Sequence, residues 1–409
     1  MILNKFTFNY FLILFCLIPV TIIIGSAFSV INILLIDLSF IILIVYKRNF
    51  FFLKSRPIIY LFVLYIYLIF NSFISLEFSE GALRNFGFLR IIILFAAFNY
   101  FFLDEKFYKK VFKFWLIVIF IVLADVFIET FMEKNIFGFD GKKYGHRIVS
   151  FFKDEPIVGG FLNGFYLILV GFLFNEVKKK NFLLSFVLTI VFMSAILLSG
   201  ERSNTIKAFI GLGLFLFFIK TIDFKIKITL LTSAIILLIF TFMNSNYLQI
   251  RFINHIYSNF KEDPIYFDLY ASGFQVFKNN KIFGVGNKNY RIETCANKET
   301  YAFKKSNKYL CNTHPHQIYF ELLSEHGIVG SFIIIFILFK LIFSKIIKVL
   351  KTNNYLKLGS FIYMLLVFTP LLPGGAFFNN FLITIFTINL SIFYAVDKNS
   401  NIFRNENYR

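Results

Sequence analysis

Long apolar runs constrain this chain more than any other feature. Of its 409 residues, 58% are hydrophobic and only 16% are charged. Apolar runs of about 17 to 22 residues recur along the whole length, and a helix rising about 1.5 Å per residue needs about 20 residues to cross the hydrocarbon of a bilayer. A soluble domain with average residue usage is far less apolar. The sequence therefore predicts an all-α polytopic membrane protein with about twelve transmembrane helices.

We expect these spans at the following apolar runs, in chain order: Tyr10–Phe28, Val30–Tyr46, Pro57–Leu76, Phe86–Leu103, Phe112–Met132, Ile157–Phe174, Phe182–Ser199, Asn204–Ile219, Ile228–Met243, Ile328–Phe343, Tyr355–Leu372 and Phe377–Ala395. The N-terminal run lacks a small-residue cleavage site, so we expect it to remain as the first span.

Lysine-rich segments orient the array, because they fall in alternate short loops, at Lys47–Arg56, Lys106–Lys113, Lys178–Lys180, Lys220–Lys227 and Lys345–Lys351. By the positive-inside rule these loops are cytoplasmic. Both termini then lie inside, and the opposite side holds a turn at 77–81, a loop at 133–156, a tight turn at 200–203, a large loop at 244–327 and a turn at 373–380.

One membrane domain in three parts is expected. Residues 1–198 supply N-terminal transmembrane helices, residues 199–345 form a core that includes the large outer loop, and residues 346–409 supply C-terminal transmembrane helices and a cytoplasmic tail. The net charge of +19 is partly the orientation signal. Because the outer loops are basic as well, we also expect an anionic partner such as a lipid phosphate or diphosphate. Nucleic acid would not meet an outward-facing loop.

His314 and His316 stand two residues apart just before a predicted span, in a protein with only five histidines. Histidine is the side chain whose unperturbed pKa lies closest to the working pH of a general base. A neutral imidazole at the membrane surface can take a proton from a sugar hydroxyl. The alternative interpretation is a pair of polar residues in a solvated loop that caps the next helix.

Four arginines lie in the outer segments, at Arg147, Arg202, Arg251 and Arg291. Arg202 lies in a turn between two spans, at the hydrocarbon boundary, where an unpaired charge is unfavourable. The neighbouring Glu201 is one candidate partner. The functional alternative is a diphosphate, since a guanidinium contacts two oxygens at once and stays charged.

Other polar residues also admit a structural and a functional interpretation. Cys295 and Cys311 lie in the large outer loop and are candidates for a disulfide. Glu321 and Glu325 share one helix face, either to orient an imidazole or, more commonly, as the polar side of an interfacial helix. The outer loops contain no Asp-x-Asp motif, so we expect neither a metal nor another cofactor.

Three motifs together suggest a family. They are Ser199-Gly-Glu-Arg202, then Phe283-Gly-Val-Gly286 followed by Asn289-Tyr290, and finally His316-Gln317 followed after nine residues by Gly327 and then Gly330. With these motifs the sequence resembles the O-antigen ligase and O-antigen polymerase superfamily of bacterial inner-membrane glycosyltransferases. The resemblance is best from about residue 199 to residue 330.

The resemblance implies a GT-C-like fold and an undecaprenyl-diphosphate-linked glycan as donor, used without metal at the periplasmic side of the inner membrane. It implies that His316 is the general base, with His314 as second choice. Arg202, helped by Arg147 or Arg291, would hold the diphosphate. Many similar ligases carry an arginine at the place corresponding to residues 266–270, and here Arg251 or Arg291 would substitute for it.

The acceptor remains open among three outcomes for this fold: ligation, polymerisation, and transfer to a Ser or Tyr hydroxyl of a protein. A ligase transfers the glycan to lipid A-core in lipopolysaccharide biosynthesis, and the spacing from His316 to Gly330 favours it. A polymerase transfers the glycan to another lipid-linked polysaccharide unit. A transporter of lipid-linked glycans is the rival from another class, and Asp37, Asp125 and Glu129 would then form a proton path.

Overall fold

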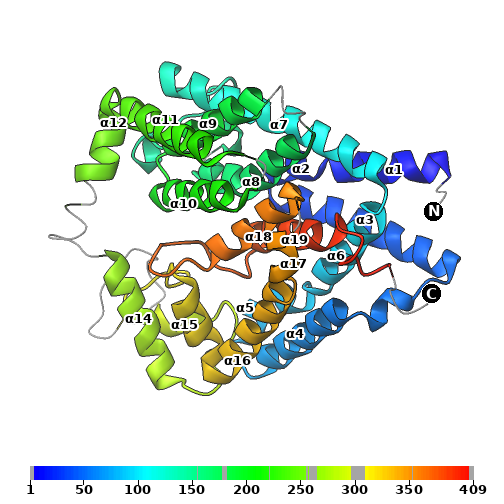
Figure 1. Ribbon diagram of the computed structural model, residues 1–409. Coiled ribbons are helices and arrows are strands. Elements are labelled where there is room, and N and C mark those ends of the chain that lie inside the picture. Colours follow the sequence, from blue (N-terminus) through cyan, green and yellow to red (C-terminus); the bar gives the residue numbers. More distant parts are fainter. Residues whose placement is uncertain are drawn as a thin grey trace.

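The computed structural model describes residues 4–153, 155–176, 182–220, 222–254, 257, 265–295, 309–351 and 353–404. Within these ranges the regular elements are helices, and the described residues contain no strand, as Figure 1 shows. The expected all-α class is confirmed.

The first half of the chain contains α1 (Lys5–Cys16), α2 (Ile18–Ile24), α3 (Ser26–Lys47), α4 (Arg56–Phe73), α5 (Phe78–Phe86), α6 (Leu89–Phe101), α7 (Glu105–Met132), α8 (Val158–Glu176), α9 (Phe182–Leu198), α10 (Arg202–Phe218) and α11 (Phe224–Met243). The second half contains α12 (Asn246–Gln249), the π-helical η5 (Ile250–Asn254), α14 (Ile265–Asn279), α15 (Tyr290–Thr294), α16 (Ile318–Phe343), α17 (Ile346–Lys351), α18 (Tyr355–Val367) and α19 (Asn380–Ala395).

Side-chain caps fix where several of these helices begin. Asp104 accepts from the N–H of Lys106 at the start of α7, and Asn379 accepts from the N–H of Leu382 at the start of α19. Pro57 stands in the first turn of α4, where its missing N–H removes no helical hydrogen bond. These polar residues separate apolar runs that would otherwise read as one continuous stretch.

Within the described ranges, eight helical stretches are long and apolar enough to cross a membrane by length and composition: Lys5–Ile24, Ser26–Lys47, Arg56–Phe73, Phe78–Phe101, Glu105–Met132, Val158–Glu176, Phe224–Met243 and Ile318–Phe343. A multi-pass membrane protein is therefore confirmed as the class, but not the number twelve. The other four predicted spans form α9, α10, α18 and α19, which have 13 to 17 residues each. At about 1.5 Å per residue such helices fall short of about 30 Å of hydrocarbon.

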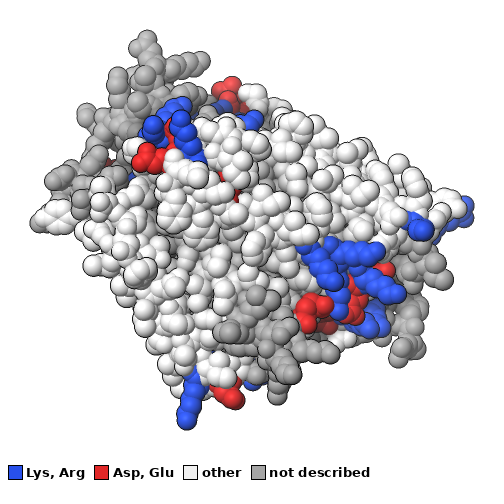
Figure 2. Space-filling view, turned by 90° about the horizontal axis from the view of Figure 1, so that it is seen from above, with Lys and Arg blue, Asp and Glu red and all other residues white. Residues whose placement is uncertain are grey.

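The surface agrees with a membrane environment. In Figure 2 the charged side chains gather in a few patches, and most of the visible face carries no charge. Many large apolar side chains are exposed on the protein surface. The exposed fraction is 86% for Tyr46 and 82% for Phe131. Exposed apolar surface of this extent is typical of contact with lipid or with partner proteins.

The two C-terminal helices α18 and α19 form the centre of the bundle. Nearly all of their residues are buried. α18 packs against α8 and α19, and α19 packs against α6, so helices from both ends of the chain meet in the middle of Figure 1. Short helices suffice here because neighbouring helices, rather than lipid, cover them.

The helix α11 lies at the periphery instead. Only 11% of its apolar window is buried, and it packs against α9, α10 and α12. It leads directly into α12 and η5, and therefore to Arg251.

The segment of the Phe283–Gly286 motif contacts the helix that carries Gly327 and Gly330. α16 begins at Ile318 rather than at Ile328, and it bends at Gly327, whose φ is +62°. At this bend Val285 N donates to Ser324 O at 3.0 Å, and Ile328 N donates to Lys281 O at 2.8 Å. A Cβ on Gly327 would lie 2.4 Å from the carbonyl oxygen of Ile282. Only glycine fits this backbone conformation and this close approach.

We predict that Gly327→Ala destabilises the protein by about 1–3 kcal/mol, since it adds both backbone strain and a clash. Thermal unfolding of the purified protein in detergent measures the loss. Gly213→Ala in α10 is the matched control, because a Cβ there meets nothing within 4 Å. Equal unfolding temperatures for the two variants would contradict the prediction.

Candidate active site

The two predicted imidazoles lie against each other at the start of α16. The ring centroids of His314 and His316 are 4.0 Å apart. The N–H of Gly374 donates to the carbonyl oxygen of His316 at 2.8 Å, which joins the histidine pair to the turn before α19. The backbone of His316 is left-handed, with φ +56°, a conformation that non-glycine residues adopt rarely and often at functional sites.

Hydrogen bonds distinguish the two rings. Nε2 of His314 lies 3.3 Å from the carbonyl oxygen of Gly374, and Nδ1 lies 3.0 Å from Oγ1 of Thr313. A carbonyl oxygen only accepts, so the proton of neutral His314 belongs on Nε2, and Nδ1 accepts from the threonine hydroxyl. Both nitrogens of His314 are therefore engaged, whereas the ring of His316 has a hydrogen bond only with the backbone of Gly374 within the described ranges.

Both imidazoles are neutral at physiological pH. Burial, together with the charge effect of the adjacent His316, lowers the pKa of His314 to about 3. Burial also lowers the pKa of His316. A neutral ring is the form that accepts a proton, so the site favours base chemistry.

Two buried carboxylates of α16 hold the segments around the histidine pair. Both oxygens of Glu321 accept from the N–H of Phe377, at 2.9 and 3.1 Å. Glu325 accepts from the N–H of Tyr290 at 3.3 Å. Their exposed fractions are 1% and 2%, so the interpretation as the polar side of an interfacial helix is wrong. Gln317, in turn, caps α16 by accepting from the N–H of Tyr319 at 2.8 Å.

Three of the four predicted arginines come together at the Ser199–Glu201 turn. Nε of Arg251 donates to the carbonyl oxygen of Gly200 at 3.3 Å. Burial lowers the pKa of Arg251, and the nearby charges of Arg147 and Arg202 lower it further. Three half-buried guanidinium groups that repel one another form a site that an anion would stabilise. We call Arg147, Arg202 and Arg251 the arginine cluster.

The loop that carries Arg147 is held by two acids of α7. Glu129 accepts from the N–H groups of Val149 and Ser150, at 3.0 and 2.6 Å. Asp125, one turn earlier, accepts from the hydroxyl of Ser150 at 2.6 Å. Both acids are thus occupied by the outer loop.

Glu201 does not form an ion pair with Arg202 among the ion pairs of the described residues. Its carboxylate accepts instead from the N–H groups of Gly159 and Gly160, at 2.6 and 3.1 Å, and from the amide of Asn204 at 2.7 Å. Burial raises its pKa to about 6. The candidate partner of Arg202 therefore anchors the start of α8, and Arg202 remains part of the arginine cluster.

Arg291 is not part of the arginine cluster. It forms an ion pair with Glu80, whose carboxylate is also 3.5 Å from Nζ of Lys288.

Tyr266 is near both the histidine pair and the arginine cluster. Its ring centroid is 6.3 Å from that of His316, and its phenol is an electrostatic neighbour of Arg251. Of the two predicted substitutes near Tyr266, the structure therefore brings Arg251 and not Arg291 to this place.

Sequence reasoning missed several residues of this region. Arg84 of α5 lies close enough for its charge to act on His314, and Glu80 occupies Arg291. Their position in the expected outer turn at 77–81, or just after it, was the available signal. Nothing in the sequence showed that this turn approaches the start of α16.

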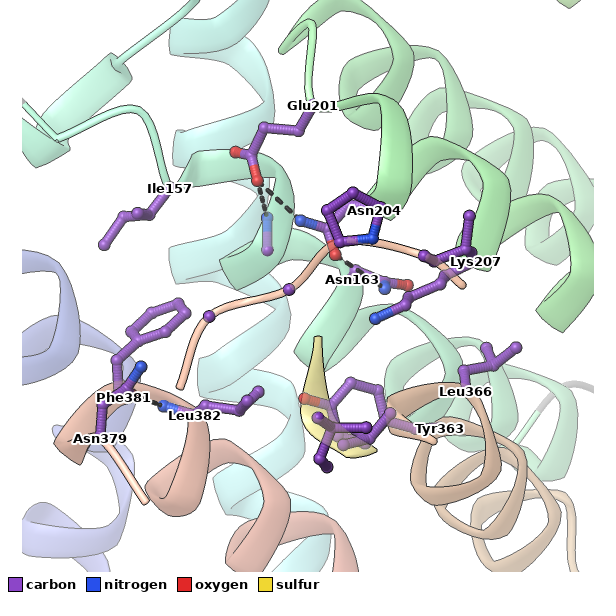
Figure 3. Close-up of a pocket in the computed structure, with 17 residues that line it drawn as sticks. Ile157, Asn163, Glu201, Asn204, Lys207, Tyr363, Leu366, Asn379, Phe381 and Leu382 are labelled. Atoms are coloured by element: carbon purple, nitrogen blue, oxygen red, sulfur yellow. Dashed lines mark hydrogen bonds between the residues drawn. The ribbon is translucent and has the colours of Figure 1, made fainter. Parts of the chain in front are cut away.

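A cavity of about 200 Å³ lies beside the histidine pair, behind the backbone of Gly374. Figure 3 shows its polar wall of Asn163, Asn204 and Lys207, with Glu201 above them. Ile157, Tyr363, Leu366, Phe381 and Leu382 supply apolar walls. The cavity is thus amphipathic, like most sites for small organic ligands.

Cys295 and Cys311 form a disulfide with Cα atoms 4.8 Å apart. The chain between them, residues 296–308, lies outside the described residues. The bridge ties the segment just before His314 to the end of α15. Among the described residues no group of three or more His, Cys, Asp or Glu side chains is placed to hold a metal ion.

Fold and site together define a multi-pass helical membrane protein with an imidazole pair, an arginine cluster and a polar cavity at one end of the bundle. Residues 184–335 match the model of a family described as O-antigen ligase, and no curated protein matches the chain. This match supports the resemblance of that part of the chain to the O-antigen ligase and polymerase superfamily. The match includes both histidines, Arg202 and Arg251, whereas Arg147 lies before it.

We predict that Glu321→Ala lowers the stability of the protein by about 1–3 kcal/mol, because it leaves the buried N–H of Phe377 without an acceptor. The turn that contacts the histidine pair is then released. Thermal unfolding and cleavage of the 373–380 turn by a protease measure the two effects. Glu155→Ala, at an exposed glutamate, serves as control, and matching behaviour of both variants would refute the assignment.

Proposed function

We propose that the protein is an O-antigen ligase of the bacterial inner membrane, with its site on the periplasmic side. It transfers a glycan from undecaprenyl diphosphate to lipid A-core, without a metal and with inversion at the anomeric carbon. The observation that carries the proposal is the neutral His316 beside the cavity, with the arginine cluster connected to it through Tyr266. The family match supports the glycosyltransferase class.

The proposed reaction is a single displacement. The acceptor hydroxyl oxygen forms a bond to the anomeric carbon of the donor while the bond from that carbon to the diphosphate oxygen breaks. His316 takes the hydroxyl proton, and the leaving diphosphate keeps the bonding electrons. General base catalysis of this kind contributes about 10²- to 10⁴-fold to the rate.

His316 suits the base role better than His314. The Nδ1 and Nε2 atoms of His314 are engaged with Thr313 and Gly374. His314 is then a positioning residue, which packs against the base and fixes its neighbour Gly374. Two rings only 4.0 Å apart do not both become charged, so His316 alone gains the proton.

The arginine cluster is the proposed diphosphate site. Arg202, Arg147 and Arg251 offer planar N–H donors that match the oxygens of a diphosphate. Their mutual repulsion is relieved when the anion binds, and the charge on the leaving group is stabilised as it develops. Arg291, paired with Glu80, is not needed for this role.

Two alternatives differ in what the acceptor is, or whether there is one. A polymerase would use the same base and arginines but a second lipid-linked glycan. The predicted spacing from His316 to Gly330 favours the ligase. A transporter is disfavoured, because Asp125 and Glu129, which a proton path would need, hold the loop of Arg147.

Complementation tests the ligase. A host that lacks its own O-antigen ligase should regain capped lipopolysaccharide on a gel when it expresses the wild type. His316→Ala and Arg202→Ala at matched expression should lower capping by at least about 100-fold, in line with the loss of a base or of leaving-group stabilisation. Arg291→Ala is the matched control and should retain most of the capping.

The possible outcomes separate the candidates. Longer lipid-linked chains without capped lipopolysaccharide would favour the polymerase. Full capping by His316→Ala would exclude it as the base.

The pH dependence provides a further prediction. An ordinary imidazole loses half of its neutral form at about pH 6.5. Because burial lowers the pKa of His316, the transfer rate should stay level as the pH falls from 8 through 6.5 and decline only below it. Initial rates in lipid nanodiscs measure the profile. A rate that halves near pH 6.5 would contradict a buried neutral base.

A further inference from the structure

The cavity behind Gly374 contains two charged side chains of opposite sign, and they differ in how they are satisfied. Glu201 already receives three N–H donors, from Gly159, Gly160 and Asn204. Lys207 has no hydrogen bond or ion pair within the described ranges, and its amine points into the cavity in Figure 3. The lining therefore has one uncompensated positive charge.

A second polar atom in the cavity also lacks a partner. Asn163 is 3% exposed, and its Oδ1 is buried without a hydrogen bond, while its Nδ2 donates to Asn204 at 3.4 Å. A buried unsatisfied acceptor calls for a ligand or a water that donates. The cavity thus presents one cation for an anionic group and one acceptor for a hydroxyl.

The remaining walls suit a ring with an apolar face. Tyr363, Leu366 and Phe381 line the cavity opposite the polar residues. The volume of about 200 Å³ equals several water molecules at about 30 Å³ each. It fits one sugar unit, whose C–H groups pack on apolar side chains while its hydroxyls face the amides.

Position connects this cavity with the proposed chemistry. Gly374 lines the cavity, and the same residue contacts both His314 and His316 through its backbone. Only the backbone of Gly374 therefore separates a ligand in this cavity from the imidazole pair. The arginine cluster, with three cations, is better suited to a diphosphate than a cavity that combines one lysine with a carboxylate.

We propose that this cavity binds one acidic sugar unit of the glycan, with Lys207 pairing with its carboxylate and Oδ1 of Asn163 accepting from a hydroxyl. The inference rests on the proposed function and adds the class of glycan that the site selects. The phosphate oxygens of the donor are the other source of an anion, and the test separates them from the sugar.

Binding to the full-length protein in lipid nanodiscs tests the site without any transfer step. The probes are methyl glucuronide and methyl glucoside, observed by saturation-transfer NMR, and inorganic diphosphate, observed by phosphorus NMR line broadening. The wild type should bind the glucuronide about tenfold more tightly than the glucoside, as expected for one charge-assisted contact. Lys207→Gln should remove this preference, and Lys207→Arg should retain it.

Lys281→Gln, at an exposed lysine of the outer segment, is the matched control and should bind like the wild type. Elution of each variant as a single species in size-exclusion chromatography separates loss of binding from misfolding. Equal binding of both sugars, or a preference that survives Lys207→Gln, would refute the acidic-sugar site. Diphosphate binding that depends on Lys207 would assign the lysine to the phosphate instead.

Failure of the site and failure of the proposed function give different results. Glucuronide binding through Lys207 in a protein that restores no capped lipopolysaccharide would keep the sugar site and remove the ligase. Capping by the wild type without any glucuronide preference would keep the ligase and remove the acidic-sugar site.

Discussion

The candidate site depends on carboxylates that accept hydrogen bonds from the backbone of segments that connect the helices. Glu129 holds the loop of Arg147, Glu201 holds the start of α8, and Glu321 holds the turn before α19. Hydrogen bonds to charged groups contribute about 1.5–3 kcal/mol each, and loss of the acceptor leaves a buried N–H unsatisfied. Strong directional contacts therefore fix irregular segments that an apolar core alone would not place.

These contacts explain how distant parts of the sequence form one site. Arg147, Arg202 and Arg251 belong to three different connections between helices, and the histidine pair belongs to a fourth. Each connection is attached to the outer end of a packed helix by hydrogen bonds, so the rigidity of the bundle extends to the functional side chains. A cluster of like charges is unfavourable by itself, and this attachment keeps its members together without a bound anion.

Much of this arrangement followed from the sequence, and some of it did not. The apolar runs predicted a multi-pass helical protein. The expected turn before Arg202 is present, because α9 ends at Leu198 and α10 begins at Arg202. Length alone did not reveal that α18 and α19 are short buried helices, since burial by protein and by lipid select the same residues. The spacing of Glu321 and Glu325 put them on one face of a helix but did not reveal their backbone partners.

The roles of the arginines were harder still to predict, because they depend on contacts between distant segments. Arg291 looked equivalent to the other three until Glu80, more than two hundred residues earlier, proved to be its partner. Lys207 had no local signal at all. Apart from Arg202 at the first position, it is the one cation of α10. Only the cavity on one side of α10 distinguishes it from a residue that reaches for the membrane surface.

The peripheral position of α11 has a consequence for the proposed diphosphate site. This helix is the span least covered by protein, and the chain that leaves it carries Arg251. Its tilt and depth follow the thickness of the surrounding bilayer, because hydrophobic mismatch acts on the apolar surface that faces lipid. The lipid composition of the membrane therefore influences the position of the Arg251 guanidinium in the arginine cluster.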